Sequence, residues 1–259
     1  MRIRPYVRSI GFQREEVPDF NRYPFCIPVV RNLDTLEFHE KVTFLVGENG
    51  TGKSTLMEAF AVVCGFCPEG GGWNFRLQTR ATHSELWRYL RVERGPLLPR
   101  DGYFLRAESF YNVATYLEDL DAVPAPAPPL SAAYGGRLHE CSHGESFFAL
   151  FQNRLGWEGL YLFDEPEAAL SPLRQMAMLS RLHQLAGQGC QFIIATHSPI
   201  LLAYPYSRIY QLEEKGIRSI SYEESTPYQL TRHFLNDYQR MTEELLDGSP
   251  EDSESETAE

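Results

Sequence analysis

The pattern of apolar and polar residues along the chain predicts alternating strands and helices. Three apolar runs, at residues 42–46, 160–163 and 190–195, have the length and continuity of strands that are covered on both faces. Residues 55–61 follow the first run and have the composition of a helix. Strands buried on both faces are typical of parallel sheets that lie between layers of helices. The pattern therefore predicts an α/β fold.

The two ends of the chain differ from this central part. Their expected elements are short strands broken by prolines over residues 1–40, an edge hairpin made of residues 208–212 and 217–220, and a helix over about residues 228–246. The last 13 residues carry six acids and no base, a composition too polar to fold. We therefore expect one domain over residues 1–246 and a disordered acidic tail over residues 247–259.

The middle of the chain, about residues 74–140, is predicted to be a mostly helical insert. Thr82-His83-Ser84-Glu85 has the pattern of a capping box at a helix start. Three arginines recur every third residue after it and would share a face of that helix: Arg88, Arg91 and Arg94. One interpretation is that this face binds nucleic acid or an acidic protein. The other is that the arginines are solvated or form ion pairs within a dimer. The proline-rich residues 123–129 predict an extended spacer.

A phosphate-binding loop lies between the first apolar run and the predicted helix. Residues 47–54 read Gly-Glu-Asn-Gly-Thr-Gly-Lys-Ser, a complete GxxxxGK[ST] motif whose backbone N–H groups wrap nucleotide phosphates. Lys53 supplies a cation for the β and γ oxygens, Ser54 a hydroxyl for Mg²⁺, and Thr55 a hydroxyl near the α phosphate. The predicted nucleotide-binding residues are Gly47, Glu48, Asn49, Gly50, Thr51, Gly52, Lys53, Ser54 and Thr55.

Two adjacent carboxylates end the second apolar run. Asp164 and Glu165 follow residues 160–163 and are expected at the carboxyl edge of the sheet, where open α/β folds bind ligands. We predict that Asp164 holds the Mg²⁺ shell and that Glu165 deprotonates the attacking water. Alone, such a pair also fits a solvated strand end. The phosphate loop about a hundred residues earlier favours the functional interpretation.

The segment Cys141-Ser142-His143-Gly144-Glu145 resembles the signature motif of ABC-type ATPases. The resemblance implies that Ser142 and Gly144 bind the γ phosphate held by a second copy, in a head-to-tail homodimer around two Mg-ATP. His143 and Cys141 depart from the family's usual Gly and Leu. The same segment also reads as a helix cap, with Ser142 and Glu145 as its capping box.

Further motifs of this family follow in order. Residues 167–171 are similar to its D-loop, where Ser171 replaces the commoner Asp, although Ser171-Pro172 is also a pattern for a helix start. His197 follows the third apolar run and matches the switch histidine, which implies contact with the γ phosphate and the attacking water. The Q-loop glutamine is missing. Glu108 either takes its metal-facing position or belongs to an ordinary strand end.

The resemblance spans about residues 1–215 and is strongest to the soluble RecF-like and SMC-like branch, without coiled-coil arms. It implies a P-loop fold of the ABC-ATPase type, with a mostly parallel core sheet flanked by helices and a smaller N-terminal antiparallel sheet. An aromatic residue is expected to stack on adenine, with Phe12, Phe20 and Tyr23 as candidates. No Asn-Lys-x-Asp motif for reading guanine occurs, which favours ATP over GTP.

Composition fits an ordinary globular protein of 259 residues with 43% hydrophobic content and a net charge of -11. No apolar run approaches the roughly 20 residues of a membrane helix and no signal-peptide core follows the first residues, so we expect a cytoplasmic protein. Five cysteines give no disulfide framework. Cys64 and Cys67 form a single CxxC whose role in redox or zinc chemistry, with His139, Cys141 and His143 as conceivable further ligands, the sequence leaves open.

The sequence thus predicts an ATPase that dimerises around two Mg-ATP and switches a separate effector protein or a bound nucleic acid, as in DNA repair or phage defence. Two alternatives stay open. One is the ATP-binding subunit of an ABC transporter, which needs a membrane partner. The other is a regulator with slow turnover that holds an effector inactive through ATP occupancy.

Overall fold

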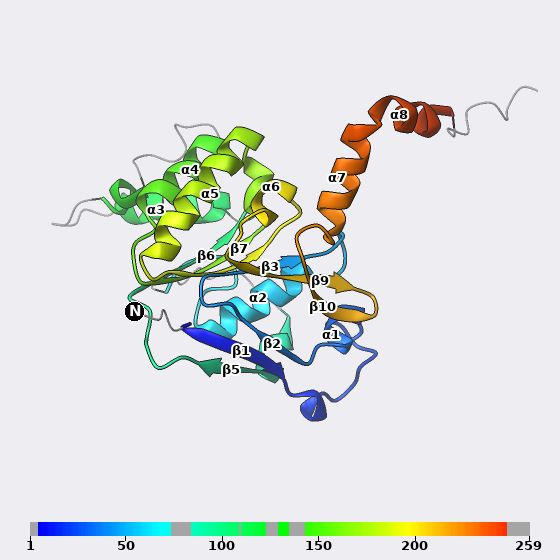
Figure 1. Cartoon of the computed structure of the whole chain (residues 1–259). Coiled ribbons are helices and arrows are strands. Elements are labelled where there is room, and N and C mark those ends of the chain that lie inside the picture. The colour runs from blue at the N-terminus through cyan, green and yellow to red at the C-terminus, as the bar shows by residue number, and fades with distance from the viewer. Residues whose placement is uncertain (1–4, 74–83, 109, 123–128, 135–142, 248–259) are drawn as a thin grey trace, which may run out of the picture.

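The computed structural model describes residues 5–73, 84–108, 110–122, 129–134 and 143–247 (Figure 1). Within them the largest unit is a sheet of seven strands in the order β10-β9-β3-β8-β7-β6-β4. Neighbouring strands from β9 to β6 run parallel, and the edge strands β10 and β4 are antiparallel to their neighbours. The strands are β3 (Val42–Val46), β4 (Gly71–Gly72), β6 (Asp101–Arg106), β7 (Gly159–Asp164), β8 (Gln191–Ala195), β9 (Ser207–Glu213) and β10 (Gly216–Ile220).

A second, smaller sheet is antiparallel and has the order β2-β1-β5. Its strands are β1 (Val7–Phe12), β2 (Thr35–Glu37) and β5 (Leu90–Arg94). The predicted small antiparallel sheet is therefore present, and two of its strands come from residues 1–40. The short helices η1 (Arg14–Glu16) and α1 (Pro28–Arg31) lie between β1 and β2 in the chain.

Helices cover both faces of the large sheet. Helix α2 (Lys53–Cys64) lies between it and the small sheet, while α3 (Phe110–Asp121), α4 (His143–Asn153), α5 (Pro172–Gly187) and α6 (Pro199–Leu202) cover the opposite face (Figure 1). The side chains of β7 alternate between two cores: Leu160 and Leu162 face α2, and Tyr161 and Phe163 face the helices on the other side. Burial on both faces explains why these strands are continuous apolar runs.

The fold agrees with the predicted class, an α/β P-loop domain with a mostly parallel sheet. The insert over about residues 74–140 is not mostly helical as predicted, because it supplies β5 and β6 as well as η2 (Glu85–Tyr89), α3 and η3 (Leu130–Tyr134). The predicted spacer falls almost wholly outside the described residues, as do the acidic tail and residues 82–83. No helix in the described ranges is long and apolar enough to cross a membrane.

The prediction of a helix carrying three aligned arginines is wrong. Residues 85–89 form the 3-10 helix η2 and residues 90–94 the strand β5, which pairs with β1 from Leu90 to Arg94. Leu90 and Val92 alternate with charged residues and pack against the core that contains α2, which is the pattern of a half-buried strand. Residues three apart in a strand point to opposite faces, so the side chains of Arg91 and Arg94 do not share one.

The C-terminal helix is two helices, α7 (Thr226–Asn236) and α8 (Tyr238–Asp247), where one was predicted. The break is at Asp237, whose backbone is not helical and whose carboxylate accepts a hydrogen bond from Arg240 Nε at 2.6 Å. Asn and Asp side chains compete with helical hydrogen bonds and favour such breaks. Neither helix has a buried residue, and together they extend away from the body of the protein (Figure 1).

Candidate nucleotide-binding site

The phosphate loop joins β3 to α2 and needs glycine at two of its positions. Gly50 and Gly52 have φ values of 80° and 97°, in the left-handed region that glycine tolerates best. Gly52 is also close to Ile27, because a Cβ placed on Gly52 would lie 2.8 Å from Ile27 Cγ2. A larger residue at position 52 would therefore be both strained and crowded.

Lys53 begins α2 and its ammonium group lies under the loop. Its Nζ donates to the carbonyl oxygens of Gly47 and Glu48, at 2.8 and 3.0 Å, and lies 4.0 Å from Glu165 Oε1. The side chain is buried, and burial lowers its pKa. The loop thus holds a desolvated cation beside the Glu165 carboxylate, which follows strand β7.

Ser54 and Asp164 meet although they are far apart in the sequence. The Ser54 hydroxyl lies 3.3 Å from Asp164 Oδ1, across the edge of the sheet. Burial raises the pKa of Asp164 to about 6, and Arg106 opposes that rise, with its Nε 3.8 Å from Asp164 Oδ2. A hydroxyl and a carboxylate are hard oxygen donors of the kind that Mg²⁺ binds together with substrate phosphates.

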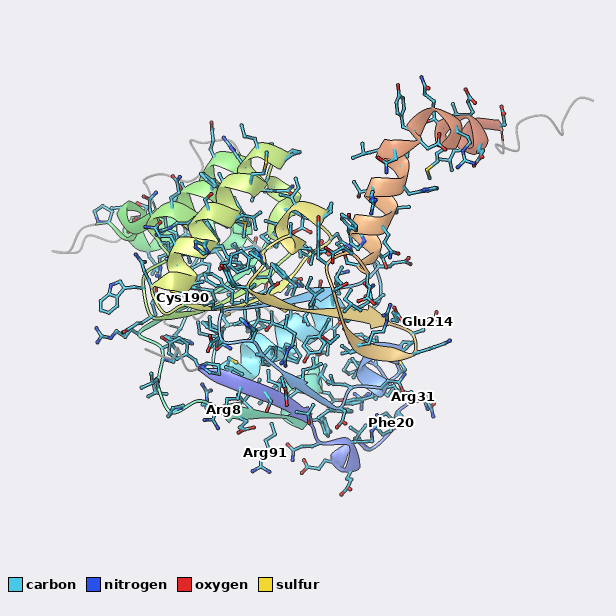
Figure 2. The ribbon with its side chains drawn as sticks, viewed as in Figure 1. Arg8, Phe20, Arg31, Arg91, Cys190 and Glu214 are labelled. Carbon is cyan, nitrogen blue, oxygen red and sulfur yellow. The ribbon has the colours of Figure 1, made fainter. Side chains whose placement is uncertain are left out.

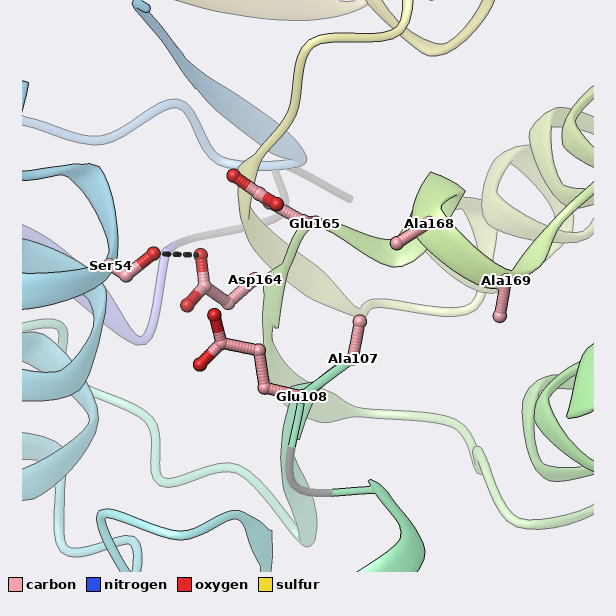
Figure 3. A pocket seen from close by; sticks show the side chains of 7 residues that line it. All are labelled: Ser54, Ala107, Glu108, Asp164, Glu165, Ala168 and Ala169. Carbon is pink, nitrogen blue, oxygen red and sulfur yellow. Dashed lines mark hydrogen bonds between the residues drawn. The ribbon is translucent and has the colours of Figure 1, made fainter. Parts of the chain in front are cut away.

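A pocket of about 320 Å³ opens at this point, lined by Ser54, Ala107, Glu108, Asp164, Glu165, Ala168 and Ala169 (Figure 3). Figure 3 shows the Glu108 and Asp164 side chains on the same side of the pocket. Glu108 is exposed, and its carboxylate lies 3.5 Å from Arg106 Nη2. Glu108 thus lines the same pocket as Asp164.

Glu165 has a constrained backbone that turns its carboxylate into the site. Its φ and ψ are both 53°, a left-handed conformation that is uncommon outside glycine and clusters at functional sites. Its N–H donates to Ala195 O at 2.9 Å, which ties the end of β7 to the end of β8. His197 follows β8, and its Nε2 lies 3.2 Å from Glu165 Oε1. The backbone N–H of His197 donates to the Glu167 carboxylate.

The predicted signature motif lies partly outside the described residues, whereas the predicted D-loop lies within them. Ser142 lies outside the described residues, and Gly144 lies in the first turn of α4. Ser171 is the N-cap of α5, with its hydroxyl accepting from the Arg174 N–H at 3.4 Å and Pro172 following it. The structural interpretation of Ser171 is therefore confirmed.

Several residues at the site were not found from the sequence. Arg106 contacts Glu58 Oε2 at 3.1 Å as well as Asp164 and Glu108, so it links α2 to the ends of β6 and β7. Gln175 hydrogen-bonds the Ser198 hydroxyl at 2.6 Å, next to His197. An arginine in a strand and a glutamine in a helix have no sequence signal that would have distinguished them.

The structure separates the three aromatic candidates for contact with the base. Tyr23 lines a pocket of about 370 Å³ with Ile27, Asn49, Gly50, Gly52, Lys53, Ser54, Thr55 and Glu165. Phe12 and Phe20 pack edge-to-face against each other, with ring centroids 6.4 Å apart. Tyr23 is therefore the candidate beside the phosphate loop.

The CxxC pair is divided between two environments. Cys64 is buried, and burial raises the pKa of its thiol to about 12, whereas Cys67 is only partly buried. Within the ranges that the structure describes, no three His, Cys, Asp or Glu side chains are grouped to hold a metal ion. His139 and Cys141 lie outside those ranges.

Two family models match the chain, and together they cover more than half of it. Residues 20–95 match "AAA domain", and residues 138–203 match "AAA domain, putative AbiEii toxin, Type IV TA system". The first range contains the phosphate loop, and the second contains Asp164, Glu165 and His197. The chain thus carries AAA-domain sequence in both of these ranges. The two matched ranges meet where Ser54 faces Asp164.

Two solved structures resemble the fold of this chain. The SMC head domain from Thermotoga maritima is 14% identical with a TM-score of 0.41, over 83% of this chain and 98% of that one. The protein cbiO1 from Clostridium perfringens, part of the ABC transporter complex cbiONQ, is 17% identical with a TM-score of 0.46, over 82% of this chain and 90% of that one. No curated protein matches the sequence.

Proposed function

We propose that this protein binds Mg-ATP at the carboxyl edge of its large sheet and hydrolyses it. One observation carries the proposal: the phosphate loop, Asp164 and the Glu165–His197 pair end three adjacent strands and converge on one site. Ser54 lies 3.3 Å from Asp164 and His197 lies 3.2 Å from Glu165. Three segments far apart in the sequence thus bring a cation, a hydroxyl, two carboxylates and an imidazole together.

The proposed roles follow from the chemistry of each group. The backbone N–H groups of the loop and the Lys53 ammonium would hold the phosphates. Ser54 and Asp164 would hold Mg²⁺, with Glu108 as a further oxygen donor. Bound there, Mg²⁺ would offset the phosphate charge.

Glu165 is the proposed general base. Its carboxylate would accept a proton from the water that attacks the γ phosphate, so that a P–O bond to this water forms while the bond to ADP breaks. The contact with His197 holds the carboxylate in place and leaves its second oxygen for the water. His197 would also hydrogen-bond the γ phosphate.

We further propose that two copies dimerise around two ATP molecules and that this dimer controls a partner. The order of the phosphate loop, the Ser142–Gly144 segment and the Asp164–Glu165 pair along the chain supports a shared site. The partner would be a separate effector protein or a nucleic acid, in repair or defence. Because Arg91 and Arg94 point to opposite faces of β5, the shared arginine face expected to bind nucleic acid is not formed.

Isothermal titration of the purified protein with ATP and Mg²⁺ tests binding. We expect Lys53→Ala to abolish tight binding, because it removes the cation beside the phosphates. Lys215→Ala, at an exposed turn between β9 and β10, is the control and should bind as the wild type does. Equal ATP affinity in the wild type and in Lys53→Ala would refute the proposed site.

A further inference from the structure

The short helix that follows Glu165 contacts the loop that carries His197. Glu167 lies in this helix, η5 (Pro166–Ala169), and its Oε1 accepts a hydrogen bond from the backbone N–H of His197. His197 is held at a second point, because its ring nitrogen Nε2 lies 3.2 Å from Glu165 Oε1. One contact holds the backbone of His197 and the other holds its ring, so both carboxylates determine where the imidazole lies.

A separate bridge holds the next residue of the same loop. The amide oxygen of Gln175, on α5, accepts from the Ser198 hydroxyl at 2.6 Å, and its amide nitrogen donates to Leu170 O at 2.9 Å. The Ser198 hydroxyl also caps α6, where it accepts from the N–H groups of residues 200 and 201. The path of the loop is therefore set by contacts that do not involve Glu167.

The Glu167 carboxylate is poorly placed for stability. Its Oε2 is buried and has no hydrogen-bond partner among the described residues. Burial lowers the pKa of Lys53, and the carboxylates that act on this ammonium to oppose the decrease are those of Glu165, Asp164 and Glu167. A buried carboxylate oxygen without a donor, close to two further acids, costs free energy. A group kept at such a cost needs a reason other than stability.

We propose that Glu167 is a positioning residue for His197, which it holds by the backbone so that the imidazole reaches Glu165. The effect on turnover rests on the proposed function, because His197 and Glu165 are the groups expected to meet the attacking water. Glu167 acts through His197 and not on the nucleotide. What matters is the hydrogen-bond acceptor of Glu167, since its partner is a backbone N–H.

Steady-state kinetics with ATP give the first test, with the wild type, Glu167→Ala, Glu167→Gln and Glu214→Ala. We expect Glu167→Ala to lower kcat about tenfold, the scale for losing a hydrogen bond to a charged group, and to leave KM within about twofold. Glu167→Gln keeps an acceptor for the His197 N–H and should recover most of the loss. Glu214→Ala is the control at the exposed β9–β10 turn, at the edge of the molecule (Figure 2), and should match the wild type.

A double-mutant cycle tests whether Glu167 acts through His197. In the His197→Ala background the backbone contact has no imidazole to place, so adding Glu167→Ala should change turnover by less than about twofold. Two residues that act independently would instead give a double variant that is slower than His197→Ala by the full factor of Glu167→Ala. Single-turnover measurement makes these slow rates accessible.

The position of the ring is also measured without nucleotide. NMR of protein labelled at the histidine ring carbons gives a signal for His197, which is assigned by its loss in His197→Ala. We expect Glu167→Ala to shift or broaden this signal and Glu214→Ala to leave it unchanged. A thermal melt checks that Glu167→Ala is folded. Glu167→Met, which fills similar space without a carboxylate, replaces Glu167→Ala if that variant does not fold.

Three results would overturn the inference. They are an unchanged His197 ring signal in Glu167→Ala, independent effects in the double-mutant cycle, and a Glu167→Gln variant as slow as Glu167→Ala, which would assign the effect to charge. Absence of ATP hydrolysis in the wild type would reject the proposed function instead. The ring signal still tests the positioning contact in that case, so the two failures are distinguishable.

Discussion

The imidazole Nε2 of His197 lies 3.2 Å from Oε1 of Glu165, although the two residues end different strands. Glu165 follows β7 and His197 lies two residues after β8. The adjacent parallel pairing of β7 with β8 brings them together, and the Glu165 N–H bond to Ala195 O fixes the distance between the two strand ends. The candidate base therefore has a residue that orients it.

Loss of this orienting contact should lower turnover more than it lowers binding. We expect His197→Ala to reduce ATP turnover roughly a hundredfold, within the range for groups that assist proton transfer, and to leave ATP affinity within a few fold of the wild type. His197→Gln, which can still donate to Glu165, should recover part of the loss. Steady-state rates at saturating ATP check this, and an unchanged rate in His197→Ala would refute the role.

Ser171 should matter for stability through its N-cap hydrogen bond. We expect Ser171→Ala to lower the free energy of unfolding by about 1 kcal/mol, the usual effect of losing such a cap. Ser171→Asn keeps an acceptor and should stay near the wild type. Urea denaturation measures both. A variant Ser171→Ala that keeps full stability but turns over ATP at least tenfold more slowly would instead indicate a D-loop role.

The central strands and the phosphate loop could be predicted because their signals are local. Residues 42–46 and 160–163 are continuous apolar runs, and burial on both faces is the physical reason for that pattern. The loop motif fixes Lys53 and Ser54 by spacing alone. The contact of Ser54 with Asp164 follows once both are placed at the same edge of a parallel sheet.

Other elements depended on contacts that a local pattern does not contain. Residues 90–94 alternate and could have been identified as a strand, but the capping-box pattern before them favoured a helix. Pairing with β1, about eighty residues earlier in the chain, makes these residues a strand. Arg106 is placed beside Asp164 by the register of β6 on β7, in which these two residues are partners. Register between distant strands has no signal in a single sequence.

A shared site should be visible when two inactive proteins are mixed. Lys53→Ala lacks the phosphate cation, and Ser142→Arg lacks the signature hydroxyl. In a head-to-tail dimer, a mixed pair has both lesions in one site and an intact second site. Random exchange makes about half of the dimers mixed, so roughly a quarter of the wild-type activity should return if the two sites act independently.

Exchange of subunits must be verified in that experiment, because dimers that do not dissociate cannot mix. Fluorescence transfer between labelled copies, in the presence of ATP, provides this control. No recovery of activity despite proven exchange would contradict independent shared sites, and a protein that also stays monomeric with ATP would contradict a dimeric site of any kind.

The most direct test of the proposed ATPase activity is a single-turnover measurement of ATP hydrolysis in the wild type and in Glu165→Gln. The amide keeps the size of the side chain and its contact with His197 but cannot accept the proton of the attacking water. We predict that Glu165→Gln binds Mg-ATP with an affinity close to that of the wild type and hydrolyses it at least roughly a hundredfold more slowly. Hydrolysis by Glu165→Gln at the wild-type rate would contradict the assignment of Glu165 as the general base.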